Sequence, residues 1–88
     1  MNFEFEKAFV KDFRKLRNKE LAIAIQETIK QVSEATNASQ IVNLKKLTGF
    51  KSAYRIRIDN YRIGVIIENN TVIFAAFAHR KDIYKHFP

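Results

Sequence analysis

The residues whose types best suit chemistry on an anion lie in the second half of the chain: Arg55, Arg57, Arg62, His79 and Tyr84. A guanidinium group stays charged and can bridge two oxygens of a phosphate or carboxylate. An imidazole with an ordinary pKa of about 6.5 can accept or donate a proton near neutral pH. The tyrosine offers a ring for stacking and a hydroxyl. For the histidine and the tyrosine, a structural role is the alternative that the sequence leaves open.

A two-residue turn at Asp59-Asn60 would bring the arginines onto one face of a hairpin, because both turn residues tolerate positive φ. In that register Arg57 pairs with Arg62, and Arg55 pairs with Gly64. Like charges directly opposite one another destabilise a sheet unless an anion lies between them. The pairing therefore predicts a bound phosphate or carboxylate, with a solvated basic face as the alternative. The glycine predicts either a close ligand approach or a bulge.

A second turn at Asn69-Asn70 extends the hairpin to three antiparallel strands, 54–58, 61–67 and 72–79, and pairs Gly64 with Ala75 and Arg62 with Phe77. Alternation then predicts two different faces. The apolar face comprises Tyr54, Ile56, Ile58, Tyr61, Ile63, Val65, Ile67, Val72, Phe74, Ala76 and Ala78. The opposite face comprises Arg55, Arg57, Arg62, Gly64, Ile66, Ile73, Ala75, Phe77 and His79.

The first half of the chain predicts a strand over residues 2–6 and a helical hairpin that covers the apolar face. The first helix starts near Lys7 and its apolar stripe is Phe9, Phe13 and Leu16. Asn18 is the expected N-cap of a second helix over residues 19–35. The buried stripe of that helix is expected to be Ala22, Ile25, Ile29 and Val32.

The remaining segments connect these elements. Residues 36–40 are small and polar and predict a loop, while Leu44 and Leu47 are expected to anchor the next connection to the core. Residues 81–88 suffice for a helical turn or a short tail. The sequence thus predicts an α+β fold in a single domain of residues 1–88.

Charge narrows the class of partner. Lys and Arg number 16 against 9 Asp and Glu, so the formal net charge is +7, which favours polyanions such as nucleic acid, an acidic protein or an anionic membrane surface. Part of this charge forms a stripe on the first predicted helix: Lys7, Lys11, Arg14 and Lys15. A plain solvated helix face is the alternative for the stripe.

Several functional classes find no support in the sequence. Without cysteine, a disulfide framework, a thiolate metal site and a cysteine nucleophile are excluded, and a reducing cytoplasm is the expected location. The apolar runs are too short to span a bilayer, and the first residues lack a signal-peptide pattern. No metal-ligand spacing, serine triad order or glycine-rich phosphate loop is visible. We expect neither a metal nor a cofactor.

The second half of the chain resembles the RelE/ParE superfamily of bacterial toxin–antitoxin toxins. The matching motifs are Leu44-Lys45-Lys46-Leu47-Thr48-Gly49, Tyr54-Arg55-Ile56-Arg57-Ile58, Tyr61-Arg62-Ile63 and His79-Arg80-Lys81-Asp82-Ile83-Tyr84, in the family's order and spacing. The first half matches in its strand-helix-helix pattern. The ending from His79 to Tyr84 favours the RelE branch.

The resemblance implies a helical hairpin packed on a curved antiparallel sheet, and a ribosome-dependent endoribonuclease that cuts mRNA in the A site by attack of the ribose 2′-OH and so inhibits translation. Carried over to this sequence, the catalytic residues are Arg55, Arg57, Arg62, Arg80 and Tyr84, and in some relatives a histidine at the position of His79 also takes part. The implied partners are a cognate acidic antitoxin, mRNA and the ribosome. Lys7, Lys11, Arg14 and Lys15 would then contact ribosomal phosphates.

One departure from the family bears on mechanism. Well-known RelE members have lysines where this chain has Arg55 and Arg57, and arginine is a poor general base because its guanidinium group keeps its proton far above neutral pH. Two other functions stay open: a ParE-like toxin that inhibits DNA gyrase without catalysis, and a basic nucleic-acid-binding module.

Overall fold

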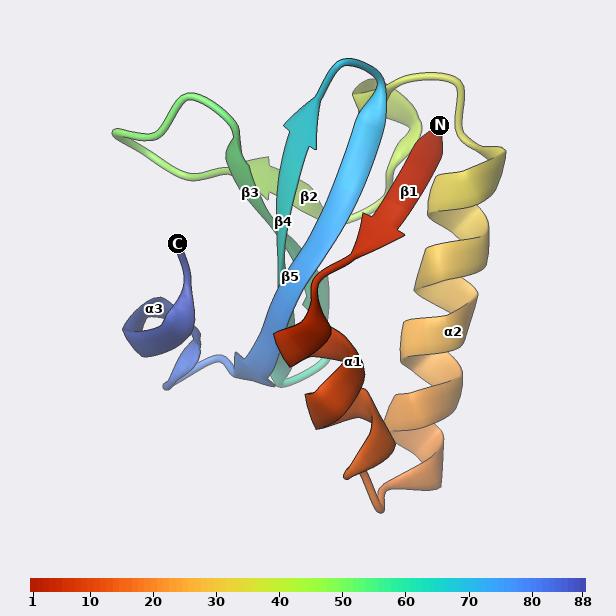
Figure 1. Cartoon of the computed structure of the whole chain (residues 1–88), viewed down its shortest axis with the longest axis vertical. Helices are drawn as coiled ribbons and strands as arrows, with labels where there is room; N and C mark the ends of the chain where they lie inside the picture. The colour runs from red at the N-terminus through yellow and green to blue at the C-terminus, as the bar shows by residue number, and fades with distance from the viewer.

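The computed structural model describes residues 1–88 as helices on both sides of one five-stranded sheet (Figure 1). Along the chain the elements are β1 (Asn2–Phe5), α1 (Lys7–Arg14), α2 (Lys19–Glu34), a 3-10 turn η1 (Ala38–Gln40), β2 (Leu44–Lys46), β3 (Ala53–Ile58), β4 (Tyr61–Glu68), β5 (Thr71–His79) and α3 (Ile83–His86). The strand order across the sheet is β1-β5-β4-β3-β2. Helices α1 and α2 cover one face, and α3 lies on the other side of the sheet (Figure 1). No helix is long and apolar enough to cross a membrane.

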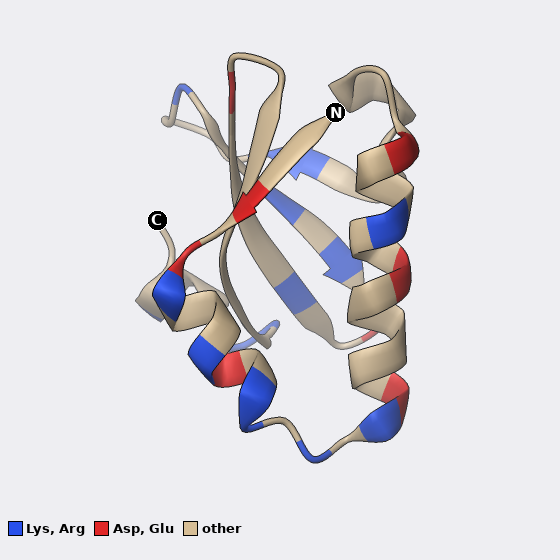
Figure 2. Ribbon diagram, turned by 45° about the vertical axis from the view of Figure 1, so that its right-hand side comes forward, with Lys and Arg blue, Asp and Glu red and all other residues tan.

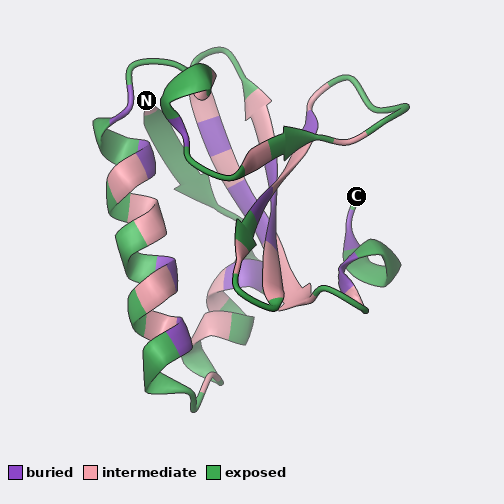
Figure 3. Ribbon diagram, turned by 180° about the vertical axis from the view of Figure 1, so that it is seen from behind, coloured by how far each residue is buried: buried purple, intermediate pink, exposed green.

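The predicted helical hairpin is confirmed. The Asn18 side chain accepts a hydrogen bond from the Leu21 backbone N–H at 3.1 Å, which caps the start of α2 as expected. Buried side chains from both helices enter the main core, and Figure 3 shows the buried side of α2 turned toward the sheet. Of the predicted stripe, Ile25 and Val32 are buried, whereas Ala22 and Ile29 are only partly buried, and Leu21, which was not predicted, is buried beside them.

The first hairpin of the sheet has the predicted register. Ile58 pairs with Tyr61, Arg57 with Arg62, and Arg55 with Gly64. Positive φ angles occur at Asp59, Asn69 and Asn70, so residues that tolerate the left-handed region make both turns.

The second hairpin departs from the predicted register because β5 contains a bulge. Val65 pairs with Phe74 but Gly64 pairs with Ala76, so Ala75 is an extra residue in β5. The bulge turns both Phe74 and Phe77 toward α1, where each ring centroid lies 5.6 Å from that of Phe9.

The predicted faces are therefore wrong beyond the bulge. Phe77 and His79 were expected on the arginine face, but they pair with Ile63 and Tyr61 and lie on the helix-covered face. Ala76 and Ala78, expected in the main core, instead line the arginine face. Adjacent alanines give no signal of where alternation breaks, so the sequence could not place the bulge.

The sheet also has more pairing than predicted. Residues 44–46, expected as an anchored connection, form β2 and pair antiparallel with β3. At the other edge, β1 pairs with β5 in parallel, so the sheet is mixed. Leu44 does anchor the connection in the main core and Leu47 packs in the second one, as predicted.

A second, smaller core holds α3 against the arginine face. Its buried members are Ala53, Ala75, Ile83 and Phe87. A Cβ atom on Gly64 would lie only 2.4 Å from the Phe87 ring, so only glycine leaves room for this ring. The close approach that the sequence predicted at Gly64, opposite Arg55, is therefore made by the chain's own Phe87 and not by a ligand.

Candidate functional site

The arginine cluster, Arg55, Arg57, Arg62 and Arg80, lies at the β3–β4 hairpin and the end of β5. Arg62 is half-buried, and its Nη1 donates to the backbone carbonyls of Asp59 and Tyr61, both at 2.9 Å. These bonds hold the guanidinium against the hairpin turn. The Arg80 backbone N–H donates to the Asn60 carbonyl at 2.8 Å, which brings the end of β5 to the same turn.

Asn43 orients the other two arginines of the cluster. The Arg55 Nη1 donates to the Asn43 carbonyl, and the Arg57 Nη2 donates to the Asn43 Oδ1, each at 3.4 Å. Asn43 has a φ of 64°, which turns the backbone sharply just before β2. The sequence did not indicate Asn43, because its position beside the arginines follows from the pairing of β2 with β3, and β2 was not predicted as a strand.

The electrostatics of the cluster are unusual. Partial burial and the neighbouring guanidinium groups of Arg55, Arg57 and Arg80 together lower the pKa of Arg62, and Tyr84 opposes this effect. The sole ion pair of the chain joins Lys85 to Asp82 at 3.4 Å, so no arginine of the cluster forms an ion pair with a carboxylate. Figure 2 shows the basic residues as bands on adjacent strands of the sheet. Such a cluster is suited to bind an anion with several oxygens.

Tyr84 completes the cluster from α3. It lies between the buried residues Ile83 and Phe87, yet 62% of Tyr84 is exposed. The two buried neighbours fix the helical turn, so the ring is held at the surface instead of packing in a core. The structure thus brings together five of the residues predicted from the sequence.

His79 does not join the cluster as predicted. Its ring lies 5.6 Å from that of Tyr61, edge to face, and its Nδ1 accepts a hydrogen bond from the Lys81 N–H at 3.2 Å. The bulge in β5 accounts for this placement, because it moves His79 to the helix-covered face.

The predicted lysine stripe forms a separate basic surface on α1. Lys7, Lys11, Arg14 and Lys15 are all exposed, and they line a shallow groove of about 390 Å³ together with Phe5 and Val10. Because α1 covers the face opposite to the arginine cluster, a single phosphate cannot touch both surfaces. A partner that contacts both must be large.

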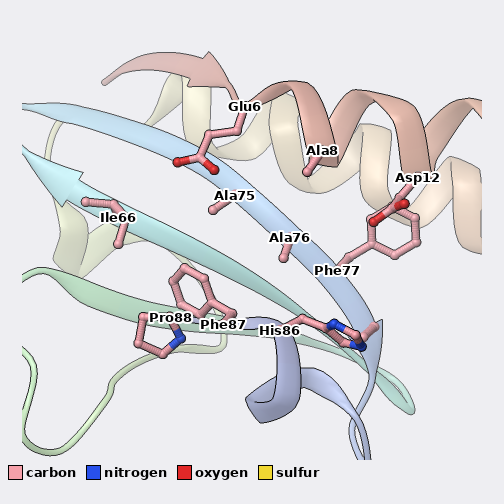
Figure 4. A pocket seen from close by; sticks show the side chains of 11 residues that line it. Glu6, Ala8, Asp12, Ile66, Ala75, Ala76, Phe77, His86, Phe87 and Pro88 are labelled. Atoms are coloured by element: carbon pink, nitrogen blue, oxygen red, sulfur yellow. The ribbon is translucent and has the colours of Figure 1, made fainter.

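The largest groove, about 620 Å³, is not the site of the arginines. It lies between α1 and α3, and Figure 4 shows Glu6 and Asp12 on the α1 side and His86 and Phe87 on the α3 side. The two carboxylates repel phosphate, so the anion chemistry belongs to the smaller, basic surface around Arg62.

Comparison with known proteins identifies relatives over nearly the whole chain. Residues 3–84 match the family model described as the ParE toxin of the type II toxin–antitoxin system parDE. Toxin RelE3 of Methanocaldococcus jannaschii is 38% identical over 93 aligned positions that span all of both chains. The toxin–antitoxin complex RelB–RelE from Methanococcus jannaschii matches with a TM-score of 0.65 and 36% identity, covering 96% of this chain and 98% of the other.

A more distant match supports the fold alone. The archaeal RelE–RelB complex from Pyrococcus horikoshii OT3 matches with a TM-score of 0.72 at 18% identity, covering 90% of this chain and 93% of the other.

Proposed function

The chain belongs to the RelE/ParE superfamily and is a toxin of a RelBE-type toxin–antitoxin pair, and we propose that it is a ribosome-dependent endoribonuclease that cuts mRNA in the A site. One observation carries the proposal: the half-buried Arg62 lies among three further guanidinium groups and beside Tyr84, and none of the four arginines forms an ion pair. This is the arrangement that a transition state rich in negative charge requires.

The proposed reaction is attack of a ribose 2′-OH on the adjacent phosphate. The 2′-oxygen forms a bond to phosphorus, the bond from phosphorus to the 5′-oxygen breaks, and the proton of the 2′-OH passes to the leaving 5′-oxygen. The products are a 2′,3′-cyclic phosphate and a 5′-hydroxyl. Arg57 and Arg62 face one another across β3 and β4, and we assign them to the oxygens of the pentacoordinate phosphorane, which bears the added charge.

Arg55, Arg80 and Tyr84 complete this assignment. Arg55 and Arg80 hold the flanking phosphates, and the exposed Tyr84 ring stacks on a base next to the scissile bond. His79 is assigned no contact with the RNA, because it lies on the other face of the sheet. The reaction needs no metal in this scheme.

The site has strong electrostatic stabilisers but no strong base, so correct placement of the 2′-OH must supply much of the acceleration. The ribosome is the agent proposed to provide this placement, and the cytoplasm is then the site of action. Lys7, Lys11, Arg14 and Lys15 on α1 are suited to contact ribosomal RNA phosphates. Free mRNA is accordingly expected to be cut slowly or not at all.

A cognate antitoxin is the second proposed partner. The solved relatives include complexes of RelE with RelB, and the +7 charge of this chain favours an acidic antitoxin. An acidic segment over the arginine cluster would both neutralise it and exclude RNA.

A ParE-like activity against DNA gyrase is the second candidate, because the matching family model is that of the ParE toxin. Primer extension on translated mRNA separates the two candidates. Cuts in register with codons, lost in Arg62→Ala and retained in the matched surface variant Arg17→Ala, are the result expected of the ribonuclease. Inhibited supercoiling by gyrase without such cuts would reject the ribonuclease and establish the alternative.

A further inference from the structure

A second basic groove adjoins the arginine cluster, between the β2–β3 loop and α3. Its volume is about 400 Å³, within the ordinary range for small-ligand pockets. Both Figure 1 and Figure 3 show that the loop and α3 project from the same side of the molecule. The polar residues and the two exposed aromatic rings of its lining come from four elements: Lys45, Lys46, Thr48, Phe50, Arg55 and Tyr84.

Two aromatic rings flank this groove at the surface. Phe50 is 50% exposed and Tyr84 is 62% exposed. Phe50 is a member of neither hydrophobic core, so packing does not explain a phenylalanine at this position. Exposed aromatic rings beside basic residues are the usual platform for the bases of single-stranded nucleic acid.

The loop that carries Phe50 is held in place. Leu47 packs in the small core at the base of the loop, and its N–H donates to the Ala53 carbonyl at 2.9 Å. The Phe50 N–H donates to the Leu47 carbonyl at 3.4 Å, and Gly49 supplies a φ of 85° at the turn. The ring is therefore presented by an ordered turn.

The pairing of β2 with β3 places two basic residues opposite one another beside the groove. Lys45 lies directly opposite Arg55, so the sheet carries a second like-charge pair beside that of Arg57 and Arg62. Each pair destabilises the free protein unless an anion lies between its members. Two neighbouring pairs on adjacent strands suit two phosphates of one chain.

We propose that this groove is a nucleotide subsite for the RNA that flanks the scissile phosphate, with Phe50 stacked on a base and Lys45 on the phosphate of that nucleotide. Arg55 and Tyr84 belong to both the groove and the arginine cluster, which makes the RNA path continuous. The inference rests on the proposed function in taking RNA as the substrate, and it adds a subsite between α3 and the β2–β3 loop.

The test uses the full chain and a short single-stranded RNA, 2′-O-methylated to prevent cleavage and carrying 2-aminopurine at one position in turn. Stacking on Phe50 is expected to quench the fluorescence of the probe at one position. Phe50→Ala should abolish that quenching and weaken binding about 5- to 150-fold, whereas Phe50→Tyr should retain both. Val42→Ala, which shortens another exposed apolar side chain, is the matched control and should bind like the unaltered protein.

Salt dependence tests the phosphate contact separately. Lys45→Ala should reduce the slope of log affinity against log salt concentration by about 0.7, the value for one phosphate of a single strand. Phe50→Ala should lower the affinity without changing that slope, because stacking releases no counterions.

Two results would overturn the subsite. One is equal RNA binding by Phe50→Ala and Val42→Ala. The other is a loss of antitoxin affinity in Phe50→Ala with RNA binding intact, which would make the groove a protein-docking surface. Because the probe cannot be cut, the test is independent of catalysis: Phe50-dependent binding without codon-registered cleavage would reject the ribonuclease and retain the subsite.

Discussion

Arg57 and Arg62 face each other across β3 and β4 and neither forms an ion pair with a carboxylate, so this arrangement opposes folding of the free protein. The pKa of Arg62 is lowered in the folded chain by partial burial and by the surrounding guanidinium groups. A lowered pKa for a basic group means that its protonated form favours the unfolded chain at every pH below that value. The charged Arg62 therefore lowers the free energy of unfolding throughout the working range of pH, and a bound anion removes this destabilisation.

Arg57→Gln should accordingly raise the melting temperature at low ionic strength. Arg57 is exposed and its side chain makes only one long hydrogen bond, to Asn43. Removing the repulsion from Arg62 should therefore outweigh the loss of that bond and raise the melting temperature by about 1–8 °C. Sulfate should stabilise the unaltered protein more than this variant and so narrow the difference. Thermal melts with Arg17→Gln as the control measure both effects, and a lower melting temperature for Arg57→Gln would contradict the repulsion.

Tyr84 gives a prediction about stacking. Because the ring is 62% exposed, Tyr84→Ala should leave the melting temperature nearly unchanged. It should slow single-turnover cleavage on programmed ribosomes by about 5- to 150-fold, while Tyr84→Phe retains most of the rate. A Phe variant as inactive as the Ala variant would instead assign the hydroxyl to proton transfer, which is worth about 10²–10⁴-fold.

At the scale of elements, α3 is held to the sheet by the small core, in which Ile83 and Phe87 are buried and the Phe87 ring lies directly over Gly64. Gly64→Ala would place a methyl group 2.4 Å from the ring, so the Phe87 ring must move out of the small core. We expect α3 to detach while the main core, on the other face, stays folded. Hydrogen exchange should then accelerate over residues 83–87 but not in α2, and cleavage should fall at least as far as in Tyr84→Ala.

Phe87→Ala provides the complementary control. It removes the ring without crowding Gly64, so it should detach α3 in the same way, and the double variant should be no worse than either single one. Normal exchange protection of α3 in Gly64→Ala would show that the ring can move aside at little cost.

Local signals predicted much of this architecture. Asn18 marked the start of α2, and Asp59 and Asn69 marked two turns, because capping and positive φ depend on the residue itself. Those turns fixed the register of Arg57 against Arg62. Three of the four arginines could thus be placed on one face from spacing alone, while Arg80 and the role of Tyr84 required the family resemblance.

Features that depend on distant packing were missed or misplaced. The bulge at Ala75 allows Phe74 and Phe77 both to pack against Phe9, a contact between distant residues that no local sequence pattern indicates. It moved His79 away from the arginines. The strand β2 is three residues long and is defined by its pairing with β3, so its sequence carried too little alternation to identify it. The positions of Asn43 and of the groove beside Phe50 both depend on β2, so neither could be predicted without that strand.

For the whole molecule, the positive charge should govern association with the antitoxin. A net charge of +7 spread over the arginine cluster and the α1 stripe should steer an acidic partner. The association rate constant should fall by about tenfold or more as ionic strength rises to physiological values and beyond. Stopped-flow mixing with the cognate antitoxin measures it, and a rate constant indifferent to salt would show that charge plays no part in the encounter.

The parallel pairing of β1 with β5 determines when the sheet can form during synthesis of the chain. Asn2 pairs with Thr71, so β1 has no partner strand until β5 has been translated. At about 5–20 residues per second, roughly 3–14 s separate the translation of these two residues. The native sheet therefore cannot close until β5 has been translated, and during that interval β1 is an unpaired strand edge, the kind of segment that is prone to aggregate in a nascent chain.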